Sequence, residues 1–250
     1  MTAFALPQLH WLNIPTGHVS LADGKGDFDV QPFRIARYPV TNAQFEAFIE
    51  DSGYRDDRWW ADAGEPNPTP EDVERGVSGW RMARERLRTP REVSWPDADC
   101  PRTDLCWYEA VAFTRWLSAK SGMRVRLPTE WEWQWAAAGE TGWDYPFGPA
   151  FDADKCNSYE SGIARTTPVT QYAGVKTAFG TADMSGNVLE WCLNENDVNP
   201  ATILTSGTGR PAIRGGSWGH DRYNCRVTFR LGFNALNSSY AVGFRLAADM

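Results

Sequence analysis

Aromatic and short polar side chains are concentrated between residues 214 and 245, and the chemistry that they support is non-covalent recognition. The stretch reads RGGSWGHDRYNCRVTFRLGFNALNSSYAVGFR, with glycine-containing ends around a middle rich in Asn, Ser, Tyr, Phe and Gly. The middle has neither helical nor strand periodicity, which favours a surface over a core. Similar residue types form antibody binding loops, where rings supply contact area at small entropic cost and short polar side chains supply adaptable hydrogen bonds.

A gap in composition is a second feature of this stretch. From Gly219 through Leu246 there is no Lys, Gln, Glu, Met or Trp, although Trp and Glu are abundant elsewhere. Chance in a short, loop-rich window is one explanation, and it stays open. The alternative is a mutational process that introduces only certain residue types at these positions.

Residues that commonly carry catalysis are few or unfavourably placed. Of the three His, His10 and His18 are in the N-terminal region, so a catalytic metal centre with several His ligands is not favoured. Glu130 and Glu132 could form an acid–base pair, but they stand at a predicted helix start, where a structural role is the simpler interpretation. The sequence has no glycine-rich phosphate loop and no G-x-S-x-G motif.

Composition indicates one globular domain over residues 1–250, with 42% apolar residues and 13 Trp that must mostly serve as packing. A net charge of −7 argues against nucleic acid as a partner. The five Cys are odd in number and irregularly spaced, unlike a disulfide framework. Neither a basic leader with an apolar run nor a membrane-length segment is present, so we expect a cytoplasmic protein without a membrane partner.

Upstream elements must position the C-terminal stretch. Alternation and turn residues predict short strands over 11–14, 19–21, 33–38 and 125–128. Apolar spacing and capping residues predict helices over 41–50, 108–121 and 129–138, and weaker patterns indicate short helices over 70–76 and 79–87. Turns and short strands follow Gly142. The sequence therefore predicts an α+β domain with few helices and irregular sheets.

Five motifs in order give the chain a family resemblance. They are YPVTNAQF (38–45), RLPTEWEW (126–133), DMSGNVLEW (183–191), RGGSW (214–218) and VGFRL (242–246). From about Trp11 to Ala248 the chain resembles the formylglycine-generating enzyme (sulfatase-modifying factor) family. The resemblance implies a C-type-lectin-like fold with mixed helices, short irregular sheets and many loops.

The resemblance also implies an oxidase chemistry that this sequence does not fully support. Oxidase members hold Cu(I) with two Cys five residues apart, just after the Gly-Gly-Ser motif, because paired thiolates suit this soft ion. Ser217 and Cys225 match the family, but His220 stands at the first Cys position. Copper is therefore not expected, and Cys225 is interpreted as a packing thiol.

Calcium is a further implication of the resemblance. The matching positions Asp183, Gly186, Val188 and Glu190 would offer carboxylate and carbonyl oxygens to a structural calcium ion. The alternative is that Asn187 and Glu190 tie the turn together by hydrogen bonds.

The C-terminal end is most similar to the variable proteins of diversity-generating retroelements, a sister group in the same fold. Adenine-directed mutagenesis of Asn-type codons in such proteins yields many residues, but not the five types that are missing here. The varied, ligand-binding positions would be Gly219, His220, Asp221, Tyr223, Asn224, Phe229, Leu231, Gly232, Phe233, Asn234, Leu236, Asn237, Tyr240 and Ala241, with Trp218 beside them. Fixed residues between them would hold the backbone: Arg222, Cys225, Arg226, Arg230, Ser238 and Ser239.

Together these observations predict a binding protein with a variable ligand-binding region over residues 214–246. Its partner would be a protein or another macromolecule, and the chain would work as a monomer or as part of a larger assembly. The alternative hypothesis is a copper- and oxygen-dependent oxidase of peptidyl Cys, or an inactive relative of one.

Overall fold

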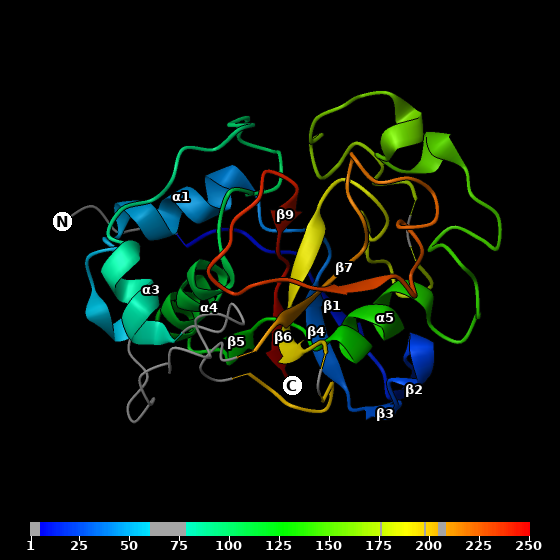
Figure 1. Ribbon diagram of the computed structural model, residues 1–250, viewed down its shortest axis with the longest axis horizontal. Helices are drawn as coiled ribbons and strands as arrows, with labels where there is room; N and C mark the ends of the chain where they lie inside the picture. The colour runs from blue at the N-terminus through cyan, green and yellow to red at the C-terminus, as the bar shows by residue number, and fades with distance from the viewer. Residues whose placement is uncertain (1–5, 61–78, 176, 198, 205–208) are drawn as a thin grey trace.

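The computed structural model describes residues 6–60, 79–175, 177–197, 199–204 and 209–250 (Figure 1). Its α-helices are α1 (Asn42–Glu50), α3 (Trp80–Arg86), α4 (Trp107–Ser121) and α5 (Glu130–Ala138). Short 3-10 helices span Ala22–Gly24, Asp57–Trp59, Ala153–Lys155 and Tyr159–Ser161. The four helices agree with predictions from the sequence, whereas the helix expected over 70–76 lies outside the described residues.

Local chemistry sets the starts of two of these helices. Thr41 and Thr129 each accept a hydrogen bond from the backbone three residues on, and Gln44 and Glu132 bond back to the cap. The sequence predicts the box at Thr129 and an N-cap at Thr41, and the structure adds the reciprocal bond from Gln44. The box at Thr129 fixes where α5 begins, and Glu130 is its first residue.

Three sheets connect distant parts of the chain. The first has the order β1-β4-β10-β5, with β1 (Trp11–Ile14), β4 (Phe33–Ala36), β10 (Ala247–Asp249) and β5 (Val125–Arg126). The second pairs β2 (Gly17–Ser20) with β3 (Asp27–Val30). The third has the order β8-β7-β6-β9, with β8 (Arg230–Gly232), β7 (Pro211–Arg214), β6 (Leu189–Glu195) and β9 (Val242–Gly243). Because β4 pairs with both β1 and β10, strands near the two ends of the chain share a sheet.

Aromatic rings fill the core between the helices and the sheets. Phe45 of α1 stacks on Phe113 of α4, with ring centroids 5.4 Å apart, and both rings contact Phe244 edge-on. Fully buried Trp side chains include Trp60, Trp80, Trp107, Trp116, Trp133 and Trp191, as the packing interpretation predicts. Phe244 belongs to the last motif, so the C-terminal end is anchored in this core.

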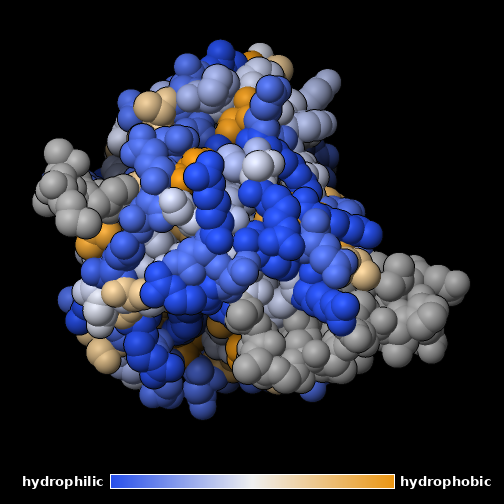
Figure 2. Space-filling model, turned by 90° about the vertical axis from the view of Figure 1, so that its left-hand side faces the viewer, coloured by the Kyte–Doolittle hydropathy of each residue, from blue (hydrophilic) through white to orange (hydrophobic). Residues whose placement is uncertain are grey.

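The face that carries α1 and α3, at the left of Figure 1, is covered mainly by hydrophilic residues (Figure 2). Hydrophobic residues form only small, separated patches on the part of this face that the structure describes. Among the described residues, no helix is both long enough and apolar enough to cross a membrane.

Candidate functional site

The C-terminal segment (residues 214–246) runs across the sheet between the α1–α4 side and α5, in orange to red in Figure 1. It leaves β7 at Arg214, returns as β8, and contains β9 near its end, directly before β10. Although its middle shows no strand periodicity, the segment contains the short strand β8, which pairs with β7 from Ala212↔Gly232 to Arg214↔Arg230. Both ends of the segment are therefore held by the same sheet.

Glu130 connects α5 to two arginines of this segment. Arg230 donates to its two carboxylate oxygens at 2.9 and 2.7 Å, and Arg214 donates to it at 3.3 Å. Arg214 also donates to Gln134 at 2.5 Å and to the Val227 carbonyl at 2.6 Å. All three charged side chains are at most 5% exposed. Glu130 thus has the structural role that its place at the start of α5 predicts.

Arg245 anchors the other end of the segment. It forms a two-point ion pair with Glu190, at 2.6 and 2.7 Å, and donates to the carbonyls of Ala36, Arg37 and Ala182. Arg245 and Glu190 are at most 1% exposed. Such a planar, two-point pair fixes orientation as well as distance, so β6, β4 and the last motif form one rigid unit.

The turn after β7 requires glycine. Gly216 has φ +72°, and a Cβ there would lie 2.6 Å from the Asn224 carbonyl oxygen and 2.8 Å from Cys225 Sγ. L side chains rarely adopt this backbone conformation, so the Gly-Gly-Ser motif lets residues 224 and 225 pack directly onto the turn.

The predicted binding positions include four aromatic anchors, Tyr223, Phe229, Phe233 and Tyr240, and two of them are open to solvent. Tyr223 is 61% and Tyr240 53% exposed, and Leu231 is also exposed at 41%. Trp218 is half-buried and lies against Tyr240, with ring centroids 5.6 Å apart. Trp95, from a loop that the sequence analysis did not select, contacts Trp218 edge-on at 6.2 Å. The tertiary fold alone places Trp95 next to Trp218, and the sequence around Trp95 does not predict this contact.

The other two predicted anchors are not free surface residues. Phe229, Phe233 and Leu236 are half-buried and pack against the main hydrophobic core, with the Phe233 ring 5.6 Å from that of Trp191. Gly232 is buried against the side chains of Asn196 and Asp197. A binding surface alone would predict that Phe233→Ala leaves stability almost unchanged; the packing of Phe233 on Trp191 and the core makes that expectation wrong.

Some of the remaining predicted contact residues form turns, and the others differ in their exposure to solvent. Asp221 accepts from the backbone N–H groups of residues 223 and 224, and Asn234 accepts from that of residue 236. Their side chains shape the turns, which lowers the number of groups available to a ligand. Gly219 and Asn237 are exposed, whereas His220, Asn224 and Ala241 are intermediate. Arg222 and Arg226, expected to hold the backbone, form partly exposed pairs with Glu160 and Asp144.

The residues matching the copper positions do not form a thiolate site. Cys225 is completely buried, and burial raises the pKa of its thiol well above the ordinary value, so the group is protonated. Ser217 is 1% exposed and its Oγ lies 2.7 Å from His220 Nδ1. Burial lowers the pKa of His220, which leaves the imidazole neutral at neutral pH. One protonated thiol beside a neutral imidazole does not fit Cu(I).

The two carboxylates among the four predicted calcium residues, Asp183 and Glu190, already accept hydrogen bonds from other side chains. Both oxygens of Glu190 accept from Arg245, and one also accepts from Trp133 at 2.7 Å, so a cation there would meet a guanidinium. Asp183 accepts from Asn187 at 2.7 Å. Among the described residues, no group of three or more His, Cys, Asp or Glu could hold a metal ion. Asn187 ties the turn to Asp183 as the alternative predicts, whereas the Glu190 carboxylate bonds to Arg245 and Trp133 outside the turn, and calcium binding stays a prediction.

Asp183 should make stability depend on pH. Desolvation by burial raises the pKa of this carboxyl to about 7 from its ordinary 3.8, although the hydrogen bond from Asn187 opposes the shift. Between these values the folded chain keeps a proton that the unfolded chain has lost, so the free energy of unfolding should fall as pH rises from about 4 to about 7. In EDTA, Asp183→Asn should remove this decrease in denaturation experiments. An unchanged slope in the variant would assign the pH dependence to another group.

The family model described as the sulfatase-modifying factor enzyme 1-like domain matches residues 8–250. The chain belongs to this family. The hercynine oxygenase of Mycolicibacterium thermoresistibile is similar in sequence, with 32% identity over 89% of this chain and 52% of the relative. The inactive Cα-formylglycine-generating enzyme 2 of Mus musculus is 27% identical over 91% of this chain and 79% of the relative. The chain spans about half the length of the hercynine oxygenases that it matches.

Solved structures confirm the fold of this family member. CarF superimposes with a TM-score of 0.68 at 23% identity, covering 97% of this chain and 99% of CarF. Treponema denticola variable protein 1 superimposes with a TM-score of 0.67 at 18% identity, covering 97% and 95%. At these identities the likeness shows the fold alone, and the predicted C-type-lectin-like, α+β class is confirmed.

Proposed function

We propose that this chain is a ligand-binding protein of the diversity-generating retroelement type, and that the exposed part of the C-terminal segment is its binding face. The observation that carries the proposal is the exposure of Tyr223 and Tyr240 on a segment whose ends are fixed by buried arginines. Rigid support lowers the entropic cost of binding through large rings. The ligand would be a protein or another macromolecule.

A selection from a displayed peptide library, with the purified protein as bait, tests the binding face. Peptides that bind the native protein should lose about 2 kcal/mol or more of affinity on Tyr240→Ala or Tyr223→Ala, because a few aromatic anchors dominate such interfaces. The melting temperature should stay almost unchanged, since both rings are more than half exposed. Trp143→Ala is the matched control, because Trp143 is 42% exposed and lies outside the segment. Peptides that bind both Tyr variants as well as the native protein would contradict the proposal.

The genomic neighbourhood tests the retroelement part separately. A template repeat should lie beside the gene, differing from the codons for residues 219–241 only at adenines, with a reverse transcriptase gene nearby. If both are absent, the retroelement assignment is wrong even if the peptide selection succeeds, and the chain would be a relative of the oxidases that does not belong to a retroelement.

Oxygenase chemistry is a second candidate, favoured by the 32% identity to a hercynine oxygenase. It predicts oxygen consumption that depends on added hercynine. The related Cys-oxidase alternative predicts Cu(I) uptake under reducing conditions and turnover of a Cys-containing peptide. We expect neither copper uptake nor turnover for the native chain, because its one matching thiol, Cys225, is buried and protonated. Stoichiometric uptake of Cu(I) measured against a competing chelator would overturn that expectation.

A further inference from the structure

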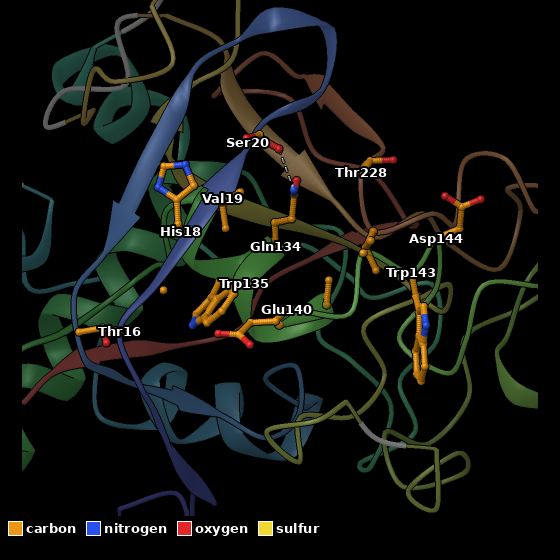
Figure 3. Close-up of a pocket in the computed structure, with 15 residues that line it drawn as sticks. Thr16, His18, Val19, Ser20, Gln134, Trp135, Glu140, Trp143, Asp144 and Thr228 are labelled. Atoms are coloured by element: carbon orange, nitrogen blue, oxygen red, sulfur yellow. Dashed lines mark hydrogen bonds between the residues drawn. The ribbon is translucent and has the colours of Figure 1, made fainter.

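A cavity of about 710 Å³ lies along β2, between this strand, the C-terminal part of α5 and the loop that follows α5 (Figure 3). Its size is within the range of ligand sites, about 300 to 1,000 Å³. Its wall includes Val227 and Thr228 of the C-terminal segment but none of the predicted ligand-binding positions. The cavity is therefore separate from the proposed binding face, and a role for it does not rest on the proposed function.

The strand that lines this cavity is an edge strand. In the described part of the chain, β2 pairs with β3 alone, and Figure 3 shows β2 between β3 and the cavity. All four residues of β2 belong to the cavity wall. An edge strand presents backbone N–H and C=O groups that no neighbouring strand bonds, so the open edge of β2 faces the cavity.

The register of the hairpin shows which groups lie on this edge. At its end, Leu21 N–H donates to the Gly26 carbonyl at 2.9 Å. Bonded and unbonded pairs alternate along an antiparallel ladder, so Val19 bonds to β3, whereas the backbone groups of His18 and Ser20 point away from β3. The His18 ring bonds to Asp29 of β3 at 2.9 Å and leaves the edge uncovered.

Two side chains of α5 confirm the direction of this edge. Gln134 donates to the Ser20 carbonyl at 3.1 Å, and the indole N–H of Trp135 donates to the Pro15 carbonyl at 3.0 Å. These bonds take one carbonyl near each end of the edge. The N–H and C=O of His18 and the N–H of Ser20 lie between them and are directed at the cavity.

The charged groups of the cavity wall are acidic. The wall contains Glu140 and Asp144 but neither Lys nor Arg. Asp144 pairs with Arg226 at 3.4 Å, whereas no cation among the described residues pairs with the exposed Glu140. Figure 3 shows the Glu140 carboxylate beside Trp135, on the side of the cavity toward Thr16. A basic side chain of a ligand would therefore meet a free carboxylate there.

We propose that this cavity binds an extended peptide segment that carries Lys or Arg and adds to β2 as a further strand. Residues two apart on a strand are roughly 6.8 Å apart, and the same spacing recurs along any extended chain. Main-chain bonds to His18 and Ser20 supply affinity that does not depend on the peptide sequence. Glu140 supplies selectivity by pairing with the basic side chain.

Hydrogen exchange in the free protein tests whether the edge is open. The amides of His18 and Ser20 should exchange at least about tenfold faster than those of Val19 and Leu21, because only the latter two bond to β3. Equal protection of all four amides would overturn the proposal. Protection of His18 and Ser20 that increases with protein concentration would also overturn it, because a second copy of the chain would then cover the edge.

Titration of the full chain with the peptide acetyl-VTKTV-amide tests binding, with the backbone amide resonances of His18 and Ser20 as the readout. These resonances should shift in a saturable manner, and their hydrogen exchange should slow. A peptide with Glu in place of the central Lys should bind at least about tenfold more weakly. Glu140→Gln should weaken binding of the Lys peptide at least about threefold and reduce its dependence on salt. Glu50→Gln, an exposed carboxylate outside the cavity, is the matched control and should have no effect.

Methylation of the peptide backbone distinguishes strand addition from side-chain contact. Of two peptides methylated at the second or the third backbone nitrogen, one should bind as the parent does and the other at least about tenfold more weakly, because only alternate residues bond to β2. Tyr240→Ala should leave binding unchanged, which separates this site from the proposed binding face. An absence of saturable binding, equal effects of the two methylations, or binding unaffected by Glu140→Gln would overturn the proposal.

Discussion

Replacing Arg245 with alanine should lower the free energy of unfolding by about 3 to 5 kcal/mol, because it leaves the buried carboxylate of Glu190 without its partner. Arg245 is fully buried and makes the two-point pair with Glu190 as well as bonds to four carbonyl groups. Those carbonyls belong to two different parts of the chain, so their loss adds to the effect. Chemical denaturation followed by circular dichroism measures the change.

Arg124→Ala is the control for this experiment. Arg124 also pairs with a carboxylate, Asp249 at 3.2 Å, but its side chain is 88% exposed. An exposed ion pair contributes about 1 kcal/mol at most. If Arg245→Ala destabilises no more than Arg124→Ala does, the last motif is not the anchor that the structure indicates.

Glu130→Ala should have a comparable effect, about 3 to 5 kcal/mol, because one carboxylate serves two buried arginines of the C-terminal segment. Without it, Arg214 and Arg230 face each other's charge away from water. We also expect faster hydrogen exchange over residues 212–232, where β7 and β8 pair. Selected peptides should then bind more weakly even though Glu130 contacts no solvent.

Two comparisons make the Glu130 experiment specific. Glu130→Gln keeps an acceptor of similar volume and should lose less stability than the alanine variant. Glu85→Ala removes a carboxylate that is 63% exposed and pairs with Arg81 at 3.5 Å, so stability should change by about 0.5 kcal/mol or less. If residues 212–232 exchange at the same rate in the native protein and in Glu130→Ala, then α5 does not hold the segment.

The aromatic residues of the C-terminal segment differ in how much they contribute to stability. Tyr223 and Tyr240 stand out from the surface, whereas Phe233 rests on Trp191 and on the core. Truncating Phe233 removes core contacts and should cost about 3 kcal/mol. Aromatic residues of one segment therefore differ in burial, and only truncation of the half-buried ring is expected to lower stability.

Some features follow from the sequence because they depend on neighbouring residues. The capping boxes at Thr41 and Thr129, the apolar face of α4 and the strand at 11–14 are set by interactions a few residues apart. The five motifs indicate the family and therefore the fold, which the family match confirms. The strand at residues 27–30 was missed, since its sequence, DFDV, is short and mostly polar.

The tertiary structure decided the parts that depend on contacts between distant residues. Periodicity cannot show that Phe233 meets Trp191, that Trp95 meets Trp218, or that Glu130 lies between two arginines about 84 and 100 positions away. The cavity between β2 and α5 likewise joins residues that no local pattern connects. The sequence determined the family, the helices and the place of the aromatic segment. Only the packing of distant side chains determined which of its rings are exposed, because burial is a property of the whole fold.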